Sequence, residues 1–309
     1  MHDIDVIIPT YKPGKEFLTL LDRLNEQTVK PGKIILMNTN ADDLHRLISD
    51  EELKRRYPNV TIFHLSKKEF DHGRTRHEGV LFSDAQYFVC MTQDAIPADR
   101  ELIEELVKAF ESDDKLAVSY ARQIPRTDCN PEELYARKFN YPVYSVRKTQ
   151  EDVDKLGIKT YFCSNVCAMY KRSIYDKMGG FIRKAIFNED MIYAGTVLKA
   201  GYATRYVPGA GVIHSHNYTC LQQFHRNFDI GVSQKEHPEI FAGLSNESEG
   251  AKMVKGTIRY LRDVHKTIRI PYYILIVASR YVGFRLGKMY KQLPKGFVKT
   301  CSLNKGYWN

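Results

Sequence analysis

Short apolar segments that alternate with helical patterns constrain the fold of this chain more than any other feature. Five segments have the length and composition of buried strands: residues 4–9, 33–37, 60–65, 85–91 and 116–120. Helical spacing of apolar residues recurs between several of them, at about 17–24, 73–83 and 100–110. Apolar strands joined by helices form a parallel sheet that is covered on both faces. We therefore predict an α/β fold with a mainly parallel sheet and helices on both faces.

A long stretch without clear periodicity, residues 121–160, follows the last of these strands. Such a stretch in a compact domain is often a substrate loop or lid. Beyond it, a second block begins with residues 161–170, and the sequence predicts strands at 203–207 and 210–214. A helix at about 190–200 is predicted to end at Gly201.

Ligands of open parallel sheets bind at the carboxyl ends of the strands. The loops after Ile8, Met37, Leu65 and Met91 are therefore expected to form a binding site. The candidate motifs lie there.

The segment Thr92-Gln93-Asp94 directly follows a predicted strand. A carboxylate at this position can hold a divalent cation, which neutralises a diphosphate leaving group. The alternative is that Asp94 caps the helix that starts near Asp99.

The pair Glu189-Asp190 opens a predicted helix. One carboxylate can act as a general base while the other forms an ion pair or a cap. The alternative is that both acids only stabilise the helix dipole.

The segment His214-Ser215-His216 follows the last predicted strand. Alternation along a strand places both imidazoles on one side, and in a turn one of them can face a metal. The alternative is a purely structural histidine pair.

The segment 70–79 contains Gly73 at a helix start, together with Arg74 and Arg76. Backbone N–H groups and guanidinium groups both favour phosphate. The alternative is a solvated basic helix end.

The composition excludes several classes of protein. Hydrophobic residues make up 43% of the chain and charged residues 27%, which is typical of a globular protein. No apolar stretch of about 18 residues occurs, so no spanning helix is predicted. The first residues, Met1-His2-Asp3-Ile4, contain no basic n-region, so we expect no export signal.

The six cysteines have no framework spacing, and Cys163 and Cys167 lack the second pair that a zinc site needs. We predict reduced, mostly buried thiols in a reducing compartment.

The positive charge of the chain is concentrated at its C-terminal end. Residues 250–309 contain 13 Lys and Arg and one acid, a net charge of +12, whereas the other residues carry a net charge of −3. Basic residues recur at helical spacing: Lys252, Lys255, Arg259, Arg262, Lys266 and Arg269. Apolar residues are predicted on the opposite side of this helix.

Pro271 is expected to start a second helix. Its predicted apolar stripe comprises Tyr272, Leu275, Ile276, Val282 and Leu286. A basic amphipathic helix followed by an apolar one predicts association with an anionic membrane surface. The alternative is a helix pair that packs on the catalytic domain or on a dimer partner.

Taken in order, the motifs resemble those of inverting family-2 glycosyltransferases, and most of all bacterial rhamnosyltransferases. The resemblance covers about residues 3–235. It rests on six segments: Val6–Tyr11, Phe70–Arg76, Thr92–Ala95, Gly179–Phe181, Glu189–Asp190 and His214–Tyr218. It implies the Rossmann-like GT-A fold, with a mixed, mainly parallel sheet, in a catalytic domain at 1–240. The residues at 250–309 would form a C-terminal helical region.

The resemblance implies that five residues surround the nucleotide of the donor: Pro9, Thr10, Tyr11, Asn38 and Thr39. Many members of the family have Asp in place of Asn38. Five further residues are implied to contact the donor: His72, Arg74, Arg76, Thr92 and Gln93. Ser164 and Asn165 match the region that usually touches the sugar or the acceptor.

Thr92 stands where the family pattern has the first Asp of a D-x-D motif. The resemblance therefore implies that Asp94 is the sole carboxylate ligand of Mg²⁺ or Mn²⁺, and that His214 or His216 completes the site.

Asp190 resembles the catalytic base of the family, with Glu189 beside it. The base would deprotonate an acceptor hydroxyl, which attacks the anomeric carbon opposite the diphosphate and inverts the configuration. The metal and Arg74 or Arg76 would stabilise the departing charge.

The resemblance implies a donor such as dTDP-rhamnose and a lipid-linked or polysaccharide acceptor in bacterial cell-envelope glycan synthesis. We expect a cytoplasmic protein that is peripheral on the inner face of the membrane and binds no nucleic acid. The sequence leaves a homo-oligomer open. One alternative is a sugar nucleotidyltransferase, although the segment 10–14 lacks the required Gly-rich, basic loop. The other is a non-catalytic, membrane-recruited module that binds nucleotide sugars.

Overall fold

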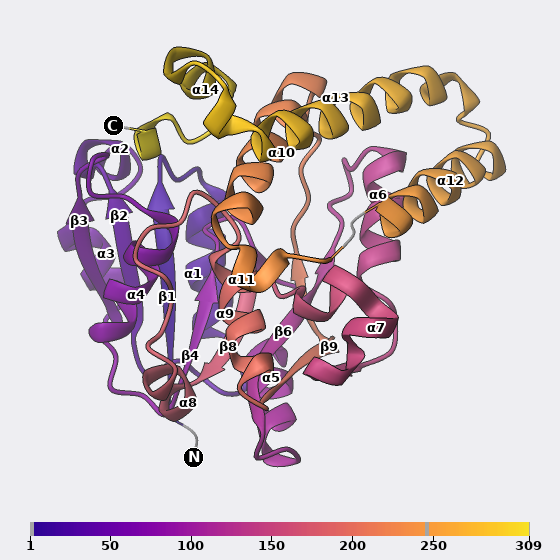
Figure 1. Cartoon of the computed structure of the whole chain (residues 1–309). Coiled ribbons are helices and arrows are strands. Elements are labelled where there is room, and N and C mark those ends of the chain that lie inside the picture. The colour runs from indigo at the N-terminus through magenta and orange to yellow at the C-terminus, as the bar shows by residue number, and fades with distance from the viewer. Residues whose placement is uncertain (1–2, 245–246, 309) are drawn as a thin grey trace. The chain divides into compact units, whose positions relative to one another are not determined.

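The computed structural model describes residues 3–244 and 247–308 of the 309-residue chain (Figure 1). The described residues form two compact units. The first unit holds the described residues of Met1–Ile124, Val143–Lys184 and Glu189–His214. The second holds those of Pro125–Pro142, Ala185–Asn188 and Ser215–Asn309.

All strands of the described residues belong to the first unit and to one sheet. They are β1 (Ile4–Tyr11), β2 (Ile34–Thr39), β3 (Val60–Leu65), β4 (Tyr87–Met91), β5 (Ile96–Pro97), β6 (Leu116–Ile124), β7 (Val146–Lys148), β8 (Cys167–Lys171) and β9 (Ala203–Ile213). Their order is β3-β2-β1-β4-β8-β6-β9-β5, and β7 also pairs with β9. The ladders from β3 to β4 and between β6 and β9 are parallel, and β8 runs antiparallel to both of its neighbours. The predicted mixed, mainly parallel sheet is confirmed.

Helices of the first unit cover both faces of this sheet. They are α1 (Glu16–Asn25), α2 (Ala41–His45), α3 (Asp50–Arg56), α4 (His72–Leu81), α5 (Leu102–Glu111), α7 (Val153–Leu156), α8 (Arg172–Lys177) and α9 (Glu189–Lys199). Alternation along β1 sends Val6 and Ile8 to one face, where they join a core with apolar residues of α1 and α5. Ile7 points to the other face, where α4 packs so closely that a Cβ at Gly79 would lie 2.6 Å from the Ile7 side chain.

An aromatic cluster fills the second face beside α8 and α9. Tyr170 of β8 lies with its ring centroid 5.2 Å from Phe88 of β4 and 5.5 Å from Tyr193 of α9. The hydroxyl oxygen of Tyr175 in α8 accepts the backbone N–H of Phe181 at 3.0 Å. This packing fixes α9, whose first turn carries two acids.

The prediction of an irregular stretch at 121–160 was wrong. Strand β6 continues to Ile124, and α6 (Pro131–Asn140), β7 and α7 occupy much of the remainder. Helix α6 has recognisable terminal signals, with Pro at its start and acids in its first turn. Lys148 of β7 is buried, and its Nζ donates to the carbonyl oxygens of Lys159 and Phe162, which ties this segment to the first unit.

The two strands predicted at 203–207 and 210–214 form one strand, β9. A register shift in its pairing with β6, between Ala121 and Arg122, accommodates the extra residues around Pro208 and Gly209.

The second unit consists of helices α6, α10 (Cys220–Glu236), α11 (Pro238–Phe241), α12 (Glu247–Asp263), α13 (Ile270–Lys288) and α14 (Lys295–Cys301). Helices α10 and α13 lie side by side (Figure 1) and approach closely through glycines. A Cβ at Gly283 would lie 2.3 Å from the backbone oxygen of Phe224, and one at Gly287 would lie 2.1 Å from that of Phe228. This contact places α10 in the second unit, although the predicted catalytic domain extended to residue 240.

The predicted basic face of α12 is confirmed over its length. Lys255 and Arg259 are exposed, whereas Thr257 and Leu261 are buried. The helix does not continue to Arg269 as predicted. It ends at Asp263, because the chain turns with His265 at φ 55° and closes a Schellman motif in which the N–H of Lys266 bonds to the carbonyl of Leu261.

The predicted apolar stripe of α13 was only partly correct. Ile276 is buried, but Tyr272, Leu275 and Val282 are exposed, because the glycine face of this helix makes the contact with α10. None of the helices in the described ranges has the length and hydropathy needed to cross a bilayer. All six cysteines are free thiols, and four of them are buried, as predicted.

We expect Gly287→Ala to lower the free energy of unfolding by about 2 kcal/mol, because overpacking against backbone costs roughly 1–3 kcal/mol. Chemical denaturation followed by circular dichroism measures this change. The matched control is Gly296→Ala in α14, where an added Cβ meets nothing within 4 Å. The control should be neutral or slightly stabilising. Equal effects of the two substitutions would contradict the close helix contact.

Candidate functional site

The carboxyl ends of the parallel strands bring most of the predicted residues to one edge of the sheet. Tyr11, Thr39 and Met91 end β1, β2 and β4, which run parallel. Strand β8 begins at this edge, because Cys167 pairs with Met91. Strands β6 and β9 end there as well, since β6 is antiparallel to β8 and parallel to β9.

Asp94 and His214 lie together at this edge. His214 Nε2 is 3.6 Å from Asp94 Oδ2, and the imidazole is nearly buried, with 7% of its surface exposed. His214 Nδ1 donates to Gln123 Oε1 at 3.0 Å, and Gln123 Nε2 donates to Ser164 Oγ at 3.0 Å. The Gln123 amide therefore fixes the tautomer of His214 and directs Nε2 toward the carboxylate. His216, two residues further along the chain, belongs to the second unit.

Glu189 and Asp190 share one partner residue, Asn165. The Asn165 side chain donates to Glu189 Oε1 at 3.1 Å, and its backbone N–H donates to Asp190 Oδ2 at 2.9 Å. Tyr170 donates its hydroxyl to Asn165 Oδ1 at 2.6 Å and so holds the amide in this orientation. Asp190 Oδ1 also accepts the backbone N–H of Met191 at 2.8 Å.

The two carboxylates have opposite electrostatic environments. Burial raises the pKa of Glu189, but the charges of Arg76 and His72 and the Asn165 hydrogen bond outweigh it, and the net shift is downward. Burial and the neighbouring charge of Glu189 raise the pKa of Asp190 to about 7. A pair whose pKa values are pushed apart divides into a permanently charged group and a group that exchanges a proton near neutral pH.

These two clusters are connected through residues that precede β8. Ser164 contacts Gln123 of the His214 cluster, and the next residue, Asn165, holds both acids. The backbone N–H of Thr92 donates to the Val166 carbonyl at 3.2 Å, which joins the Asp94 loop to the same segment. The structure therefore brings Asp94, His214 and Asp190 to one region of the first unit.

The side chains predicted to surround the donor base form a hydrogen-bonded chain. Thr10 Oγ1 donates to Asn38 Oδ1 at 3.0 Å, and Asn38 Nδ2 lies 2.9 Å from His64 Nδ1. Thr10 and Asn38 are buried, so these contacts position the strand ends. Thr39 Oγ1 is buried and makes no hydrogen bond within the described residues.

Tyr11 is the most accessible of the predicted base residues, with 42% of its surface exposed. The Nζ atoms of Lys12 and Lys67 lie 5.4 Å and 5.6 Å from its ring centroid. The side chain of Gln93 forms two hydrogen bonds with the backbone of Tyr11. Its Oε1 accepts the Tyr11 N–H at 2.8 Å, and its Nε2 donates to the Tyr11 carbonyl at 2.9 Å. Gln93 thus joins the Asp94 loop to the end of β1.

The helix start at Gly73 differs from the predicted anion site. Asp71 caps α4 by accepting the backbone N–H groups of Gly73 and Arg74 at 2.9 Å and 3.0 Å, so these donors are already used. Glycine is needed at position 73 because a Cβ there would lie 1.9 Å from the Ile182 carbonyl oxygen. His72 is the first residue of the helix, and Arg74 donates to the Glu69 carbonyl.

Arg76 has a different role from the predicted phosphate contact. Its guanidinium forms an ion pair with Glu189 at 3.0 Å, and each side chain is only 7% exposed. Arg76 also donates to the His72 carbonyl at 3.0 Å. Arg76 therefore stabilises the ionised carboxylate of Glu189.

Sequence reasoning missed three residues of this region: Gln123, Tyr170 and His64. Gln123 lies at the end of β6, which the sequence placed in an irregular stretch. Tyr170 belongs to none of the sequence motifs. No local pattern relates these residues to their partners, because each contact joins segments that are distant in the sequence.

Comparison with known proteins gives consistent matches. Residues 5–179, more than half of the chain, match the family described as Glycosyl transferase family 2. The chain is 39% identical over 311 residues to the O-antigen chain rhamnosyltransferase RfbN of Salmonella typhimurium, covering 99% of this chain and 96% of that protein. It is 35% identical over 314 residues to the O-antigen chain rhamnosyltransferase WbaN of Salmonella anatum, covering 100% and 96%.

Solved structures share the fold at low sequence identity. The mannosyltransferase PcManGT from Pyrobaculum calidifontis, in complex with GDP-Man and Mn²⁺, has a TM-score of 0.56 at 13% identity and covers 100% of this chain and 87% of its own. TarS 1–349 of S. aureus, in complex with UDP-GlcNAc, has a TM-score of 0.53 at 12% identity and covers 94% and 92%.

Arg76→Met should lower the free energy of unfolding by about 3 kcal/mol, because it leaves the buried Glu189 carboxylate without its ion-pair partner. Thermal and chemical denaturation measure the loss. The double variant Arg76→Met/Glu189→Gln should recover much of it, since no unpaired charge remains. If the double variant is less stable than the wild type by the sum of the losses in Arg76→Met and Glu189→Gln, the two residues are not coupled.

Proposed function

Since this chain belongs to glycosyl transferase family 2, we propose that it transfers a rhamnosyl group from a nucleotide diphosphate donor, dTDP-rhamnose, to a glycan acceptor. Two relatives that cover nearly the whole chain are named O-antigen chain rhamnosyltransferases, which supports this sugar and a polysaccharide acceptor. The mixed, mainly parallel sheet and its solved neighbours confirm the predicted GT-A fold class.

The observation that carries the proposed chemistry is the environment of Asp190. Its carboxylate is oriented by two backbone N–H groups, and its pKa is raised to about 7 by burial and by Glu189. A general base is most effective when its pKa lies near the working pH. Asp190 therefore has the properties of the group that accepts the proton of an acceptor hydroxyl.

The reaction is a single displacement. The acceptor oxygen forms a bond to the anomeric carbon while its proton passes to Asp190. The bond between the anomeric carbon and the diphosphate oxygen breaks, and the electron pair leaves with the nucleotide diphosphate. Because the attack and the departure occur on opposite faces of the sugar, the configuration inverts. Glu189 stays ionised beside Arg76 and keeps the pKa of Asp190 high.

The donor would lie along the carboxyl ends of the strands. The exposed ring of Tyr11 offers a stacking surface for the base, and Lys12 and Lys67 beside it offer positive charge. The buried hydroxyls of Thr39 and Thr92 make no hydrogen bond within the described part of the chain, so both have capacity for the donor. Ser164 and Asn165 lie between the two clusters, where the transferred sugar would be placed.

The residues around Asp94 fit a divalent cation. Asp94 would contribute a carboxylate oxygen, and His214 would contribute Nε2 while its Nδ1 donates to Gln123, as metal-bound histidines commonly do. His216, close in sequence, is proposed as a further ligand. Bound Mg²⁺ or Mn²⁺ would supply positive charge opposite the diphosphate oxygens.

We further propose that the second unit binds an anionic membrane surface. Helix α13 and the turn before it expose apolar residues at helical spacing: Ile268, Tyr272, Ile274, Leu275, Tyr281 and Val282. Basic residues of α12 and α13 accompany them, among them the exposed Arg262 and Arg285. Apolar side chains with adjacent basic groups are typical of interfacial attachment.

Asp190→Asn should reduce kcat for rhamnosyl transfer from dTDP-rhamnose by about 10²–10⁴-fold, because an amide cannot accept the proton. In the wild-type protein, kcat/KM should rise with pH below about 7 and level off above it, since the ionised carboxylate is the active form. Glu189→Gln should move this limb to lower pH, because the charge that raises the pKa of Asp190 is gone. Full transfer by folded Asp190→Asn would rule out this base, and absence of turnover with any nucleotide sugar would leave a binding module.

The membrane proposal predicts that the protein floats with vesicles that contain phosphatidylglycerol and much less with neutral phosphatidylcholine vesicles. Leu275→Asp combined with Tyr281→Asp should reduce flotation about tenfold, because the exposed apolar face is lost. The control is Leu303→Asp, an equally exposed apolar residue outside α13, where 55% of the surface is accessible. Equal flotation of all three proteins would contradict the assigned surface.

A further inference from the structure

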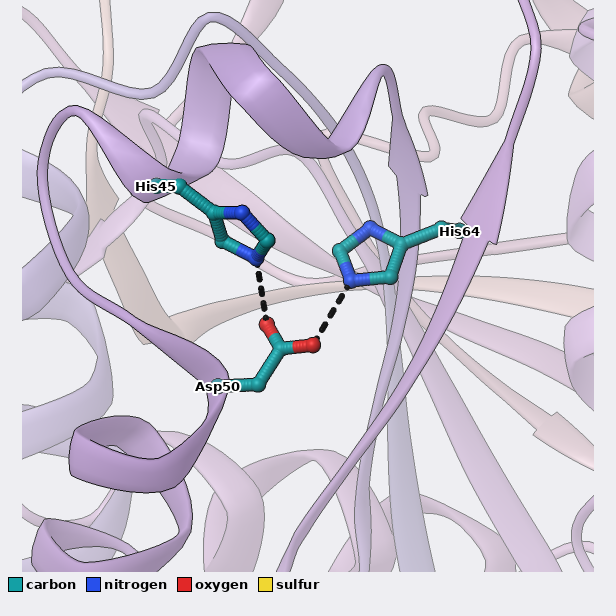
Figure 2. Close-up of side chains that lie close together, drawn as sticks. All are labelled: His45, Asp50 and His64. Atoms are coloured by element: carbon teal, nitrogen blue, oxygen red, sulfur yellow. Dashed lines mark hydrogen bonds and ion pairs between the residues drawn. The ribbon is translucent and has the colours of Figure 1, made fainter.

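A second cluster of metal-ligating side chains lies on the first unit, apart from Asp94 and His214. It consists of His45 at the end of α2, Asp50 at the start of α3 and His64 of β3 (Figure 2). Asp50 Oδ1 is 3.1 Å from His45 Nε2, and Asp50 Oδ2 is 2.9 Å from His64 Nε2. Figure 2 shows both imidazoles directing these nitrogens at the same carboxylate.

We propose that His45, Asp50 and His64 form a binding site for a transition-metal cation of the Zn²⁺ class. All three ligand atoms lie within 4.8 Å of one another. Zinc binds imidazole nitrogen and carboxylate oxygen at about 2.0–2.2 Å, which places neighbouring ligand atoms of a tetrahedral site roughly 3.3 Å apart. The N–O separations of 3.1 Å and 2.9 Å are each within a few tenths of an ångström of this value. They involve the two different oxygens of Asp50, so the side chains must close further around one ion.

The chemistry of the three ligands selects the metal. Two imidazoles and one carboxylate suit Zn²⁺ and related ions, whereas Mg²⁺ and Ca²⁺ prefer oxygen ligands only. The pKa of Asp50 is lowered, because the hydrogen bonds from His64 and His45 outweigh its burial, so the carboxylate is ionised at neutral pH. The side chains are 42%, 28% and 29% exposed, so a cation can enter and water can complete its coordination.

The other nitrogen of His64 connects this site to the strand ends. In the metal-free state, Asn38 Nδ2 donates to His64 Nδ1, so the His64 proton resides on Nε2 and is donated to Asp50. A metal on Nε2 requires the proton to move to Nδ1. The Asn38 amide must then rotate so that its oxygen accepts the proton of His64 Nδ1. After this rotation the amide nitrogen faces Thr10 Oγ1, and the hydrogen bond from Thr10 Oγ1 to Asn38 Oδ1 is lost.

This rotation has two consequences. It gives up the hydrogen bond from Asn38 Nδ2 to the Asn40 carbonyl, which opposes binding and weakens the affinity. It also changes the hydrogen bonding of Thr10, so the cation would affect the donor site. This second consequence rests on the proposed function, whereas binding of the metal does not.

The test is a Zn²⁺ titration of the full chain, after removal of metal, in competition with a chromophoric chelator. The residues around Asp94 are the same in every protein compared, so Zn²⁺ bound there contributes equally to each titration. The wild-type protein should take up one more equivalent than His45→Ala or Asp50→Asn. The matched control is His237→Ala, which removes an imidazole that also pairs with a carboxylate, Glu239, at 2.9 Å. The control should titrate like the wild type.

A second variant tests the proton shift. Asn38→Asp offers His64 Nδ1–H an acceptor without any amide rotation, so it should tighten Zn²⁺ binding by about tenfold, the scale of such supporting contacts. The proposal is overturned if wild type, His45→Ala and Asp50→Asn titrate alike, or if His237→Ala loses the same equivalent. Unchanged or weaker binding by folded Asn38→Asp would overturn the coupling to Asn38.

Discussion

Asn165 holds both carboxylates of the candidate site, one through its side chain and the other through its backbone. It can do so because it lies two residues before β8, the strand that runs antiparallel between β4 and β6. The reversal brings the residues before β8 to the carboxyl ends of the parallel strands, where the Asp94 loop and the end of β6 also lie. Tyr170, further along the same strand, fixes the Asn165 amide. The acid pair, the histidine cluster and the Asp94 loop thus share one short segment as their common support.

The electrostatics of the acid pair follow from this support. Two adjacent carboxylates in a buried environment repel each other, and one of them must be compensated. Arg76 neutralises the charge of Glu189 through a nearly buried ion pair. The carboxylate whose pKa is raised is therefore Asp190. An arginine that resembled a phosphate ligand in the sequence therefore pairs with a carboxylate of the candidate site. Gln123 supports His214 in a comparable way, since it accepts the Nδ1 proton and so sets the tautomer of the imidazole.

Several elements could be predicted because their signals are local. Strand β3 occupies 60–65 as predicted, and α9 ends before Gly201, which has φ 86°. Other elements were missed because the signal is not local. The polar end of β6 is stable as a strand only because β9 pairs with it, and the single strand β9 exists because a bulge absorbs Pro208 and Gly209. The first helix of the C-terminal region was predicted to reach Arg269, but it ends at Asp263. No local signal in the sequence marked this end, because the residue with positive φ at the turn is His265 and not a glycine.

The sequence by itself determined the alternation of strands and helices, the candidate acids and histidines, and the basic face of α12, because each depends on periodicity or on neighbouring residues. Only the tertiary structure decided what those residues do. It paired Arg76 with Glu189, used the Gly73 amide in a helix cap, and turned the glycine face of α13 toward α10. These choices depend on contacts between segments far apart in the chain, where burial and the exclusion of water determine which partner a charged or polar group takes.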